Sequence, residues 1–234
     1  MNNIAEYVLC RDNIFYFMEK YLKLEFRGYQ IDILARYEDP NRPFILNILG
    51  HRGFGISTMN AIYLLWRVMF YPNEKLLLVV PNSSTIKEEH ELIMRLYSTV
   101  TSLWPDDSVR YKVNVTSMGR IIFNNDSMIK IVTYSPDRVR GWSFDTIIMD
   151  STGTMGYNFF NNVIANGKKF IFTNSSVPES EELDNMGDCH RYPWYCDNDR
   201  TLDWYIQMLN SLGKPEFNRN YGSNRGFSDD QRRL

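Results

Sequence analysis

The fold of this chain is decided by the stretch Gly50-His51-Arg52-Gly53-Phe54-Gly55-Ile56-Ser57-Thr58. An apolar run, residues 44–49, precedes the stretch, and apolar residues at helical spacing follow it over residues 59–70. A strand, a glycine-rich turn and a helix in this order form the context of a phosphate-binding P-loop, whose spacing is G-x-x-x-x-G-K-[ST]. The pattern therefore predicts a strand–loop–helix unit that cradles a phosphate.

The match to the P-loop spacing is incomplete at one position. Gly50 and Gly55 are correctly spaced. Ser57 and Thr58 follow as the hydroxyl residues, but Ile56 stands where the lysine belongs. Without the lysine, the spacing alone also fits a tight turn in an ordinary α/β protein. We expect a nucleotide-binding loop that lacks its main cation, with the tight turn as the alternative.

Helix and strand signals alternate along much of the chain. Near-continuous apolar runs, typical of strands buried on both faces of a parallel sheet, cover residues 44–49, 75–80, 145–150 and 169–173. Helical periodicity covers residues 12–38 (as two helices), 59–71, 83–99 and 201–212. This alternation predicts an α/β fold in which helices flank a mostly parallel sheet. With the loop at residues 50–58 the fold is P-loop NTPase-like, and the family resemblance given below implies the ASCE class.

Three segments interrupt this alternation. Residues 113–132 contain short alternating runs around an Asn124-Asn125-Asp126 turn, which predicts a small β-hairpin insertion. Residues 179–198 are rich in loop formers and acids. Residues 213–234 are rich in Asn, Gly, Arg and Asp and have little periodicity, so we expect a linker or flexible tail there.

Composition limits the classes of function. The 234 residues include 26 Lys and Arg against 28 Asp and Glu, so no global basic field marks a nucleic-acid-binding protein. Any contact with DNA has to come from a local patch. The three cysteines lack paired spacing, which favours a reducing compartment. Neither a signal peptide nor an apolar run of roughly 18–20 residues is present, so we expect a soluble intracellular protein without a membrane partner.

A P-loop ATPase needs more than backbone amides around its phosphates. A lysine neutralises phosphate charge, a hydroxyl and a strand-end Asp hold Mg²⁺, and a following carboxylate positions the attacking water. Ser57 and Asp150 supply the two metal ligands. Ile56 and Ser151 stand at the lysine and carboxylate positions and supply neither group. The sequence predicts a binding frame without the two groups that contribute most to hydrolysis.

The succession of these features resembles the ATPase domain of tailed-phage terminase large subunits, the DNA-packaging motors, in the myovirus-like branch. The family's phosphate loop, R-x-x-G-K-[ST], corresponds to RGFGIS, and its R-G-x-[ST] lead-in to the acidic strand corresponds to RGWS. The resemblance spans about residues 12–222 and implies a terminase-like ATPase domain over residues 1–212. It is carried by residues 15–34, 50–85, 137–151, 168–180 and 199–223.

The resemblance also implies roles for single residues around the nucleotide. Tyr29 and Gln30 fall on the pair that reads adenine. Arg52 falls on the arginine of the phosphate loop, which is proposed to act as a charge-stabilising finger. Asp150 matches the first acid of the family's Asp-Glu pair, whereas Ser151 departs from the catalytic Glu.

Four further residues lie in segments that connect hydrolysis to movement and to partners. Asn174 and Ser175 follow the coupling motif that links hydrolysis to movement. Arg138 and Arg140 are candidates for contact with a neighbouring subunit or with DNA, with a solvated loop as the alternative. The implied cofactors are ATP and Mg²⁺. The implied partners are double-stranded DNA, portal or the small terminase subunit, and other motor subunits, in the host cell cytoplasm.

Three readings of the function remain open. The first is a degenerate terminase ATPase domain with weak or no hydrolysis. The second is a working packaging motor that uses Arg52 for the lysine and a carboxylate from elsewhere. The third is a pseudo-ATPase that binds a packaging partner and no nucleotide. The family's nuclease domain begins where this chain stops, so we expect no nuclease activity.

Overall fold

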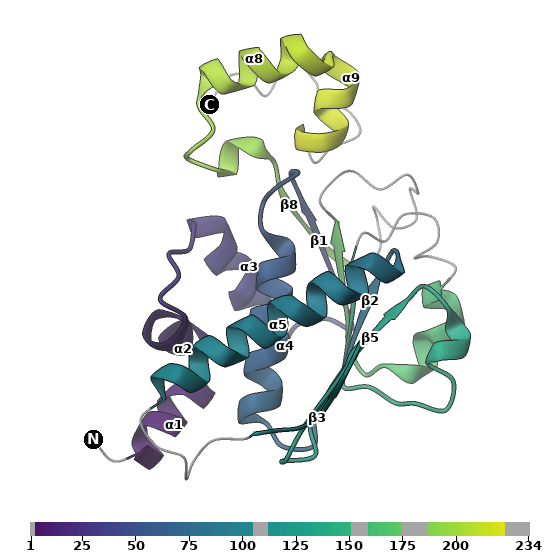
Figure 1. Ribbon diagram of the computed structural model, residues 1–234. Coiled ribbons are helices and arrows are strands. Elements are labelled where there is room, and N and C mark those ends of the chain that lie inside the picture. The colour runs from purple at the N-terminus through teal and green to yellow at the C-terminus, as the bar shows by residue number, and fades with distance from the viewer. Residues whose placement is uncertain (1–2, 105–111, 151–158, 175–186, 223–234) are drawn as a thin grey trace.

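The computed structural model describes residues 3–104, 112–150, 159–174 and 187–222. Its centre is one eight-stranded sheet with the strand order β3-β4-β5-β2-β6-β7-β1-β8 (Figure 1). The strands are β1 Ile45–Gly50, β2 Lys75–Val80, β3 Val113–Ser117, β4 Arg120–Phe123, β5 Met128–Thr133, β6 Thr146–Asp150, β7 Phe170–Asn174 and β8 Asp188–Tyr192. Along the order β5-β2-β6-β7-β1-β8, every neighbouring pair of strands is parallel. This confirms the predicted mostly parallel α/β sheet.

The predicted hairpin extends one edge of this same sheet. β3 pairs antiparallel with β4, and β4 pairs antiparallel with β5. β5 in turn runs parallel to β2, so the hairpin shares its last strand with the parallel core. At the other edge, β8 lies beside β1, in a segment for which the sequence predicts only loop. That prediction was wrong for residues 188–192, because an edge strand needs no continuous apolar run.

Helices cover both faces of the sheet, with α1 to α5 on one side (Figure 1). The helices are α1 Asn3–Asp12, α2 Ile14–Phe17, α3 Gly28–Glu38, α4 Ile56–Phe70, α5 Ser83–Leu103, α8 Leu202–Leu212 and α9 Lys214–Phe217. Shorter turns are η1 Met18–Leu22, η2 Pro136–Arg138, η3 Ile164–Asn166, η4 Trp194–Cys196 and η5 Asn218–Gly222. Among the described residues, no helix is long and apolar enough to cross a membrane.

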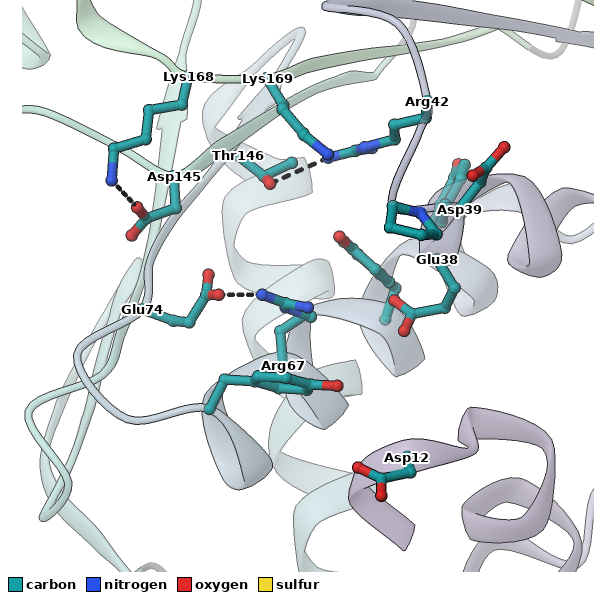
Figure 2. A pocket seen from close by; sticks show the side chains of 14 residues that line it. Asp12, Glu38, Asp39, Arg42, Arg67, Glu74, Asp145, Thr146, Lys168 and Lys169 are labelled. Atoms are coloured by element: carbon teal, nitrogen blue, oxygen red, sulfur yellow. Dashed lines mark hydrogen bonds and ion pairs between the residues drawn. The ribbon is translucent and has the colours of Figure 1, made fainter. Parts of the chain in front are cut away.

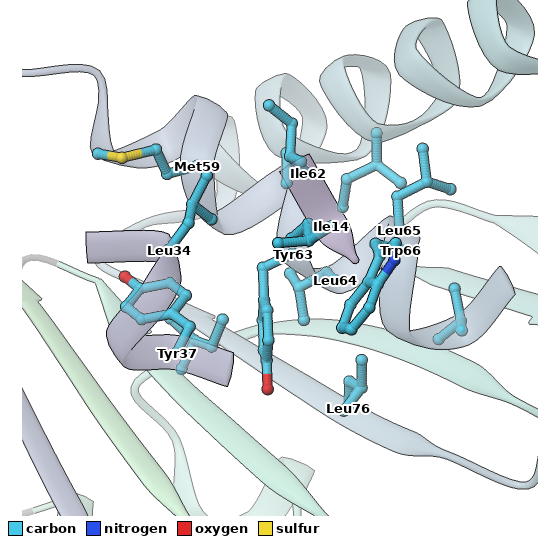
Figure 3. Close-up of a cluster of buried hydrophobic side chains, with 14 of the residues drawn as sticks. Ile14, Leu34, Tyr37, Met59, Ile62, Tyr63, Leu64, Leu65, Trp66 and Leu76 are labelled. Atoms are coloured by element: carbon cyan, nitrogen blue, oxygen red, sulfur yellow. The ribbon is translucent and has the colours of Figure 1, made fainter. Parts of the chain in front are cut away.

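The alternation of side chains along β2 shows how the sheet separates two cores. Leu76, Leu78 and Val80 join the larger apolar cluster with α1 to α5, whereas Leu77 and Val79 join the smaller cluster on the other face. A strand buried on both faces needs a continuous apolar run, which is why β2 is predictable from sequence. In the larger cluster, α4 is buried almost all round and packs against α2 and α3 (Figure 3).

The C-terminal helices α8 and α9 lie at the end of the sheet where β8 finishes (Figure 1). Aromatic rings from residues 194–221 pack against one another there. Phe217 is 1% exposed, and its ring centroid lies 5.1 Å from that of Tyr205 and 6.1 Å from that of Trp204. Residues 214–222, where the sequence predicts a linker, are therefore helical and packed. Residues 223–234 lie outside the described part of the chain.

Candidate nucleotide site

The loop before α4 has the backbone that a phosphate cradle requires. Gly53 and Gly55 have φ of 80° and 82°, in the left-handed region that favours glycine. A Cβ at Gly55 would lie 2.8 Å from Gln30 Nε2, the end of a flexible side chain that can move aside, so it is the left-handed φ that favours glycine there. These two glycines let the chain turn sharply from β1 into α4.

The N-terminus of α4 is open to an anion. Gly55 caps this fifteen-residue helix without any side-chain hydrogen bond, and the first turn holds no acidic residue. The amides of Ile56, Ser57 and Thr58 therefore have no acceptor within the helix, and the helix dipole adds partial positive charge at the same point. Such an end binds phosphate oxygens. This part of the predicted site fits the phosphates of a nucleotide.

The outer part of the loop is held by the C-terminal region. The amide of His51 donates to the Tyr192 carbonyl at 2.9 Å, and the amide of Arg52 donates to the Asn220 carbonyl at 2.6 Å. Arg200 Nη2 donates to the Arg52 carbonyl at 2.7 Å. The Arg52 side chain itself is exposed. The loop's backbone is thus fixed by segments that follow it by 140 residues or more in the chain.

Ile56 does more than replace a lysine. Its side chain is 5% exposed and belongs to the larger apolar core. The position that would carry a cation over the phosphates therefore carries a side chain packed into the protein. The predicted loss of the lysine is accompanied by an inward-packed isoleucine.

Asp150 lies at the carboxyl end of β6, separated from β1 by the single strand β7. It is 7% exposed, and its Oδ1 accepts a hydrogen bond from Thr173 Oγ1 at 3.1 Å. Thr173 in turn accepts from Asn60 Nδ2 at 3.3 Å, and Asn60 Oδ1 accepts from the Tyr37 hydroxyl at 2.9 Å. A buried chain of hydrogen bonds therefore runs from α3 through α4 and β7 to this acid. It fixes the Asp150 carboxylate.

The sequence argument missed a second carboxylate beside the loop. Glu89 of α5 is 5% exposed, and its carboxyl accepts a hydrogen bond from the Ser57 side chain. Burial is the largest cause of a raised pKa at Glu89, to about 7, and the negative charge of Asp150 adds to it. Helical spacing could have indicated that Glu89 is buried. Glu89 falls on the apolar stripe of α5 that includes Ile86 and Ile93, where a glutamate is unusual.

The predicted adenine pair contacts the loop but is engaged within the protein. Tyr29 is 6% exposed, and its ring packs edge-on against His51 with centroids 5.7 Å apart. Gln30 Oε1 accepts from the Arg27 amide at 3.0 Å, and Gln30 Nε2 donates to the Phe54 carbonyl at 3.1 Å. Gln30 thus joins α3 to the loop. Its reading of adenine stays a prediction.

The remaining predicted residues are only partly described. Asn174 ends β7, is 4% exposed and lies beside Leu49 of β1, close to the start of the loop. Ser151 and Ser175 lie outside the described residues, as do the three glutamates of residues 179–182. Their roles stay predictions.

The two candidate contact arginines lie between β5 and β6. Both Arg138 and Arg140 are exposed, and Arg140 Nε lies 3.3 Å from an Asp137 oxygen. The side chains of that pair are 81% and 77% exposed, so the pair contributes little to stability. The arginines are accessible to a partner, which agrees equally with a solvated loop.

A separate cavity of about 560 Å³ lies at the opposite, amino-terminal edge of the strands (Figure 2). Two of its ion pairs are closed within the protein: Arg67 pairs with Glu74, and Lys168 Nζ lies 2.6 Å from Asp145 Oδ1. Glu38 and Arg42 each keep a buried atom without a hydrogen-bond partner in the described part of the chain. Arg42, 7% exposed, donates to Thr146 Oγ1 at 3.2 Å. Ligands of open parallel sheets bind at the carboxyl ends of the strands. The loop, rather than this cavity, is therefore the candidate nucleotide site.

Comparison with known proteins agrees with the fold described above. No family model matches the sequence. Among solved structures, the large terminase ATPase domain of Thermus phage P74-26 matches with a TM-score of 0.68 at 13% identity, over 90% of this chain and 97% of that one. The chain has a terminase ATPase fold. This is a statement about architecture, because identity this low establishes the fold alone.

Two longer proteins share the terminase ATPase fold with this chain. The HK97 bacteriophage large terminase matches with a TM-score of 0.67 at 15% identity, over 92% of this chain and 55% of that one. The large terminase of thermophilic bacteriophage D6E, in complex with ADP, matches with a TM-score of 0.61 at 14% identity, over 86% of this chain and 54% of that one. This chain thus spans about half the length of these two terminases.

Proposed function

We propose that this chain is a phage DNA-packaging, terminase-like ATPase domain that binds Mg²⁺–ATP at residues 50–58 and hydrolyses it weakly or not at all. The observation that carries the proposal is the open N-terminus of α4 behind two left-handed glycines, with Asp150 one strand away from β1. A similar fold in the D6E terminase is seen with ADP and with ATP-γ-S. The fold and the loop together support nucleotide binding.

Different groups of the chain bind the phosphates and the metal of Mg²⁺–ATP. The amides of residues 56–58 hold phosphate oxygens, as at other helix N-termini. Ser57 and Asp150 offer hydroxyl and carboxylate oxygens, the ligands that Mg²⁺ prefers. When bound, the metal supplies positive charge to the phosphates. Thr173 keeps the Asp150 carboxylate in one orientation through its hydrogen bond.

Weak hydrolysis follows from the groups that are replaced. Ile56 removes a charge-assisted contact to phosphate, and its inward packing prevents a simple rotation from restoring contact. Ser151 supplies no carboxylate to position water, and loss of such a group lowers rates by about 10²–10⁴-fold. These two replacements leave binding less impaired than turnover.

One observation favours the second reading, a working motor with unorthodox residues. That reading requires a carboxylate from another part of the chain, and Glu89 lies against Ser57 with Asp150 nearby. It also requires a cation in place of the lysine, and Arg52 is an exposed guanidinium on the loop. Measured turnover above a low background would favour this reading.

The expected partners follow from the same proposal. Double-stranded DNA, other motor subunits, and portal or the small terminase subunit are the partners of a packaging domain, and the host cytoplasm is where packaging takes place. The exposed side chains of Arg138 and Arg140 are the candidate contacts with DNA or a neighbouring subunit. Replacing both with alanine is expected to weaken DNA binding and leave nucleotide binding unchanged.

The test is nucleotide binding and turnover on the whole chain. Mg²⁺–ATP at about 100 times its dissociation constant should stabilise the protein by roughly 2.7 kcal/mol, seen as a rise in melting temperature. A Gly55→Val variant should lose this rise, because a β-branched residue is strained at a φ of 82°. Arg140→Ala serves as the control that keeps it. Absence of any rise in the natural chain would overturn nucleotide binding and leave a partner-binding pseudo-ATPase.

A further inference from the structure

Glu89 is a buried carboxyl group that the P-loop motif does not account for. It lies on α5, which crosses α4 (Figure 1), and its neighbours on the same helix stripe, Ile86 and Ile93, belong to the larger apolar core. A glutamate that is 5% exposed at such a position is unusual, since Glu is almost never fully buried unless paired. A carboxyl in this location either holds a proton or is paired with a positive group.

The contacts of Glu89 supply no such partner among the described residues. Its carboxyl accepts a hydrogen bond from the Ser57 hydroxyl, while Oε2 is buried with no hydrogen-bond partner in the described part of the chain. The charged groups that act on it, Asp150 and Glu88, are both negative. Buried charges in proteins are paired or coordinate metals. With Ile56 at the lysine position, the motif's own cation is absent from this place.

The groups around Glu89 are of the types that bind Mg²⁺. Its carboxyl interacts with the Ser57 hydroxyl and with the charge of Asp150, and carboxylate and hydroxyl oxygens are ligands of Mg²⁺. Asp150 is 7% exposed at the end of β6, and α5 packs against α4, the helix that carries Ser57. The buried Oε2 of Glu89 is therefore an oxygen ligand that is available to an ion.

We propose that Ser57, Glu89 and Asp150 form a divalent-cation site in which the Glu89 carboxylate is a direct ligand and Mg²⁺ binds without nucleotide. In a chain with the proposed nucleotide-binding function, on which this last step rests, the ion held by Glu89 replaces the charge of the missing lysine beside the phosphates. A conventional P-loop site takes up its metal together with the nucleotide. Here the protein itself supplies two carboxylates and a hydroxyl.

The test is Mn²⁺ binding to the nucleotide-free full chain, followed by electron paramagnetic resonance of free Mn²⁺. Mn²⁺ takes the same oxygen ligands as Mg²⁺. We expect one site in the natural chain, competed by Mg²⁺, and an affinity reduced about tenfold or more in Glu89→Gln, since even outer-sphere partners of a metal contribute that much. Glu91→Gln is the matched control, because Glu91 is exposed on the same helix and lies 3.8 Å from Lys87.

A thermal melt of the same proteins separates metal binding from misfolding. Without metal, Glu89→Gln should melt at or above the temperature of the natural chain, because it removes an unpaired buried charge, and added Mg²⁺ should then raise its melting temperature less. No Mn²⁺ site in the natural chain, or equal affinity in Glu89→Gln, would overturn the inference. ATP binding is measured in a separate experiment in EDTA. If the chain binds Mn²⁺ but no nucleotide, the proposed function is refuted and the metal site is not.

Discussion

Arg200 Nη2 donates a hydrogen bond to the carbonyl of Arg52 at 2.7 Å, which ties the C-terminal region to the outer turn of the phosphate loop. The same guanidinium lies 4.6 Å from the ring centroid of Trp204 and 3.3 Å from an Asp197 oxygen. The Arg200 side chain is 14% exposed, so most of it lies within the packed C-terminal region. Arg200 therefore connects the loop to the packed C-terminal helices.

We expect Arg200→Ala to destabilise the chain and loosen the loop. Loss of a hydrogen bond from a charged donor costs about 1.5–3 kcal/mol, measurable by urea denaturation. Hydrogen exchange at the Arg52 amide should speed up, because its acceptor, the Asn220 carbonyl, belongs to the region that Arg200 holds in place. Arg140→Ala, at an exposed position, should stay within about 0.5 kcal/mol of the natural chain. Unchanged exchange at residue 52 would show that the loop is held by other contacts.

The buried chain from Tyr37 to Asp150 gives a second prediction. Thr173→Val removes the hydrogen bonds of the Thr173 hydroxyl with Asn60 and Asp150 and should destabilise the protein by about 1–3 kcal/mol. Thr173→Ser, which keeps the hydroxyl and loses a methyl group, should cost only about 0.8 kcal/mol. Tyr37→Phe combined with Thr173→Val should be less damaging than the sum of the two single changes. Strict additivity would mean that the residues do not act as one chain.

How much of this site was predictable depends on where each signal lies in the sequence. The loop and α4 are local features, because the glycines and the apolar run of β1 stand next to each other in the chain. Asp150 was predictable because β6 is buried on both faces and carries a continuous apolar run into the acid. Each of these follows from neighbours within a few residues.

Glu89 and β8 were not predictable in this way. Glu89 reaches the site only because α5 packs on α4, a relation between segments that no local pattern contains. β8 has the sequence DCHRY and only Tyr192 of its residues is buried, so its strand character comes from backbone pairing with β1. The packed C-terminal helices are similar, since α9 is four residues long and is stabilised through Phe217 rather than by periodicity.

The cavity at the amino-terminal edge leads to a prediction about pH. Burial is the main cause that raises the pKa of Glu38 from 4.5 to about 7, with Glu74 adding to it and Arg67, Arg42 and Lys169 opposing it. A carboxyl whose pKa is higher in the folded protein stabilises the fold fully below about pH 4.5. That contribution is lost as pH rises through 7.

We therefore expect Glu38→Gln to become progressively more stable than the natural chain between pH 5 and pH 8. Gln has nearly the same shape as protonated Glu and does not ionise, so the difference in free energy of unfolding should be small at pH 5 and grow toward pH 8. Urea denaturation at each pH measures it, with Glu91→Gln as the exposed control that shows no such trend. A difference independent of pH would show that Glu38 titrates normally in the folded chain.

Restoring the two replaced groups is the sharpest test of degeneracy. Ile56→Lys should reduce stability by about 1–3 kcal/mol, because Ile56 is 5% exposed in the apolar core and a lysine must leave that packing to reach solvent or phosphate. In the same variant the affinity for Mg²⁺–ATP should rise, since the ammonium gains a charge-assisted contact to phosphate. The opposite signs of these two effects distinguish a restored ligand contact from general damage.

The double variant Ile56→Lys with Ser151→Glu should then gain turnover as well as binding. The added carboxylate supplies the water-positioning group, whose presence is worth about 10²–10⁴-fold in rate. Steady-state phosphate release with and without DNA measures this, and Ile56→Met with Ser151→Gln is the control that matches the shapes without the charges. If the natural chain already turns over as fast as the double variant, and Glu89→Gln or Arg52→Ala abolishes that rate, the chain is a working motor that has replaced its catalytic groups rather than lost them.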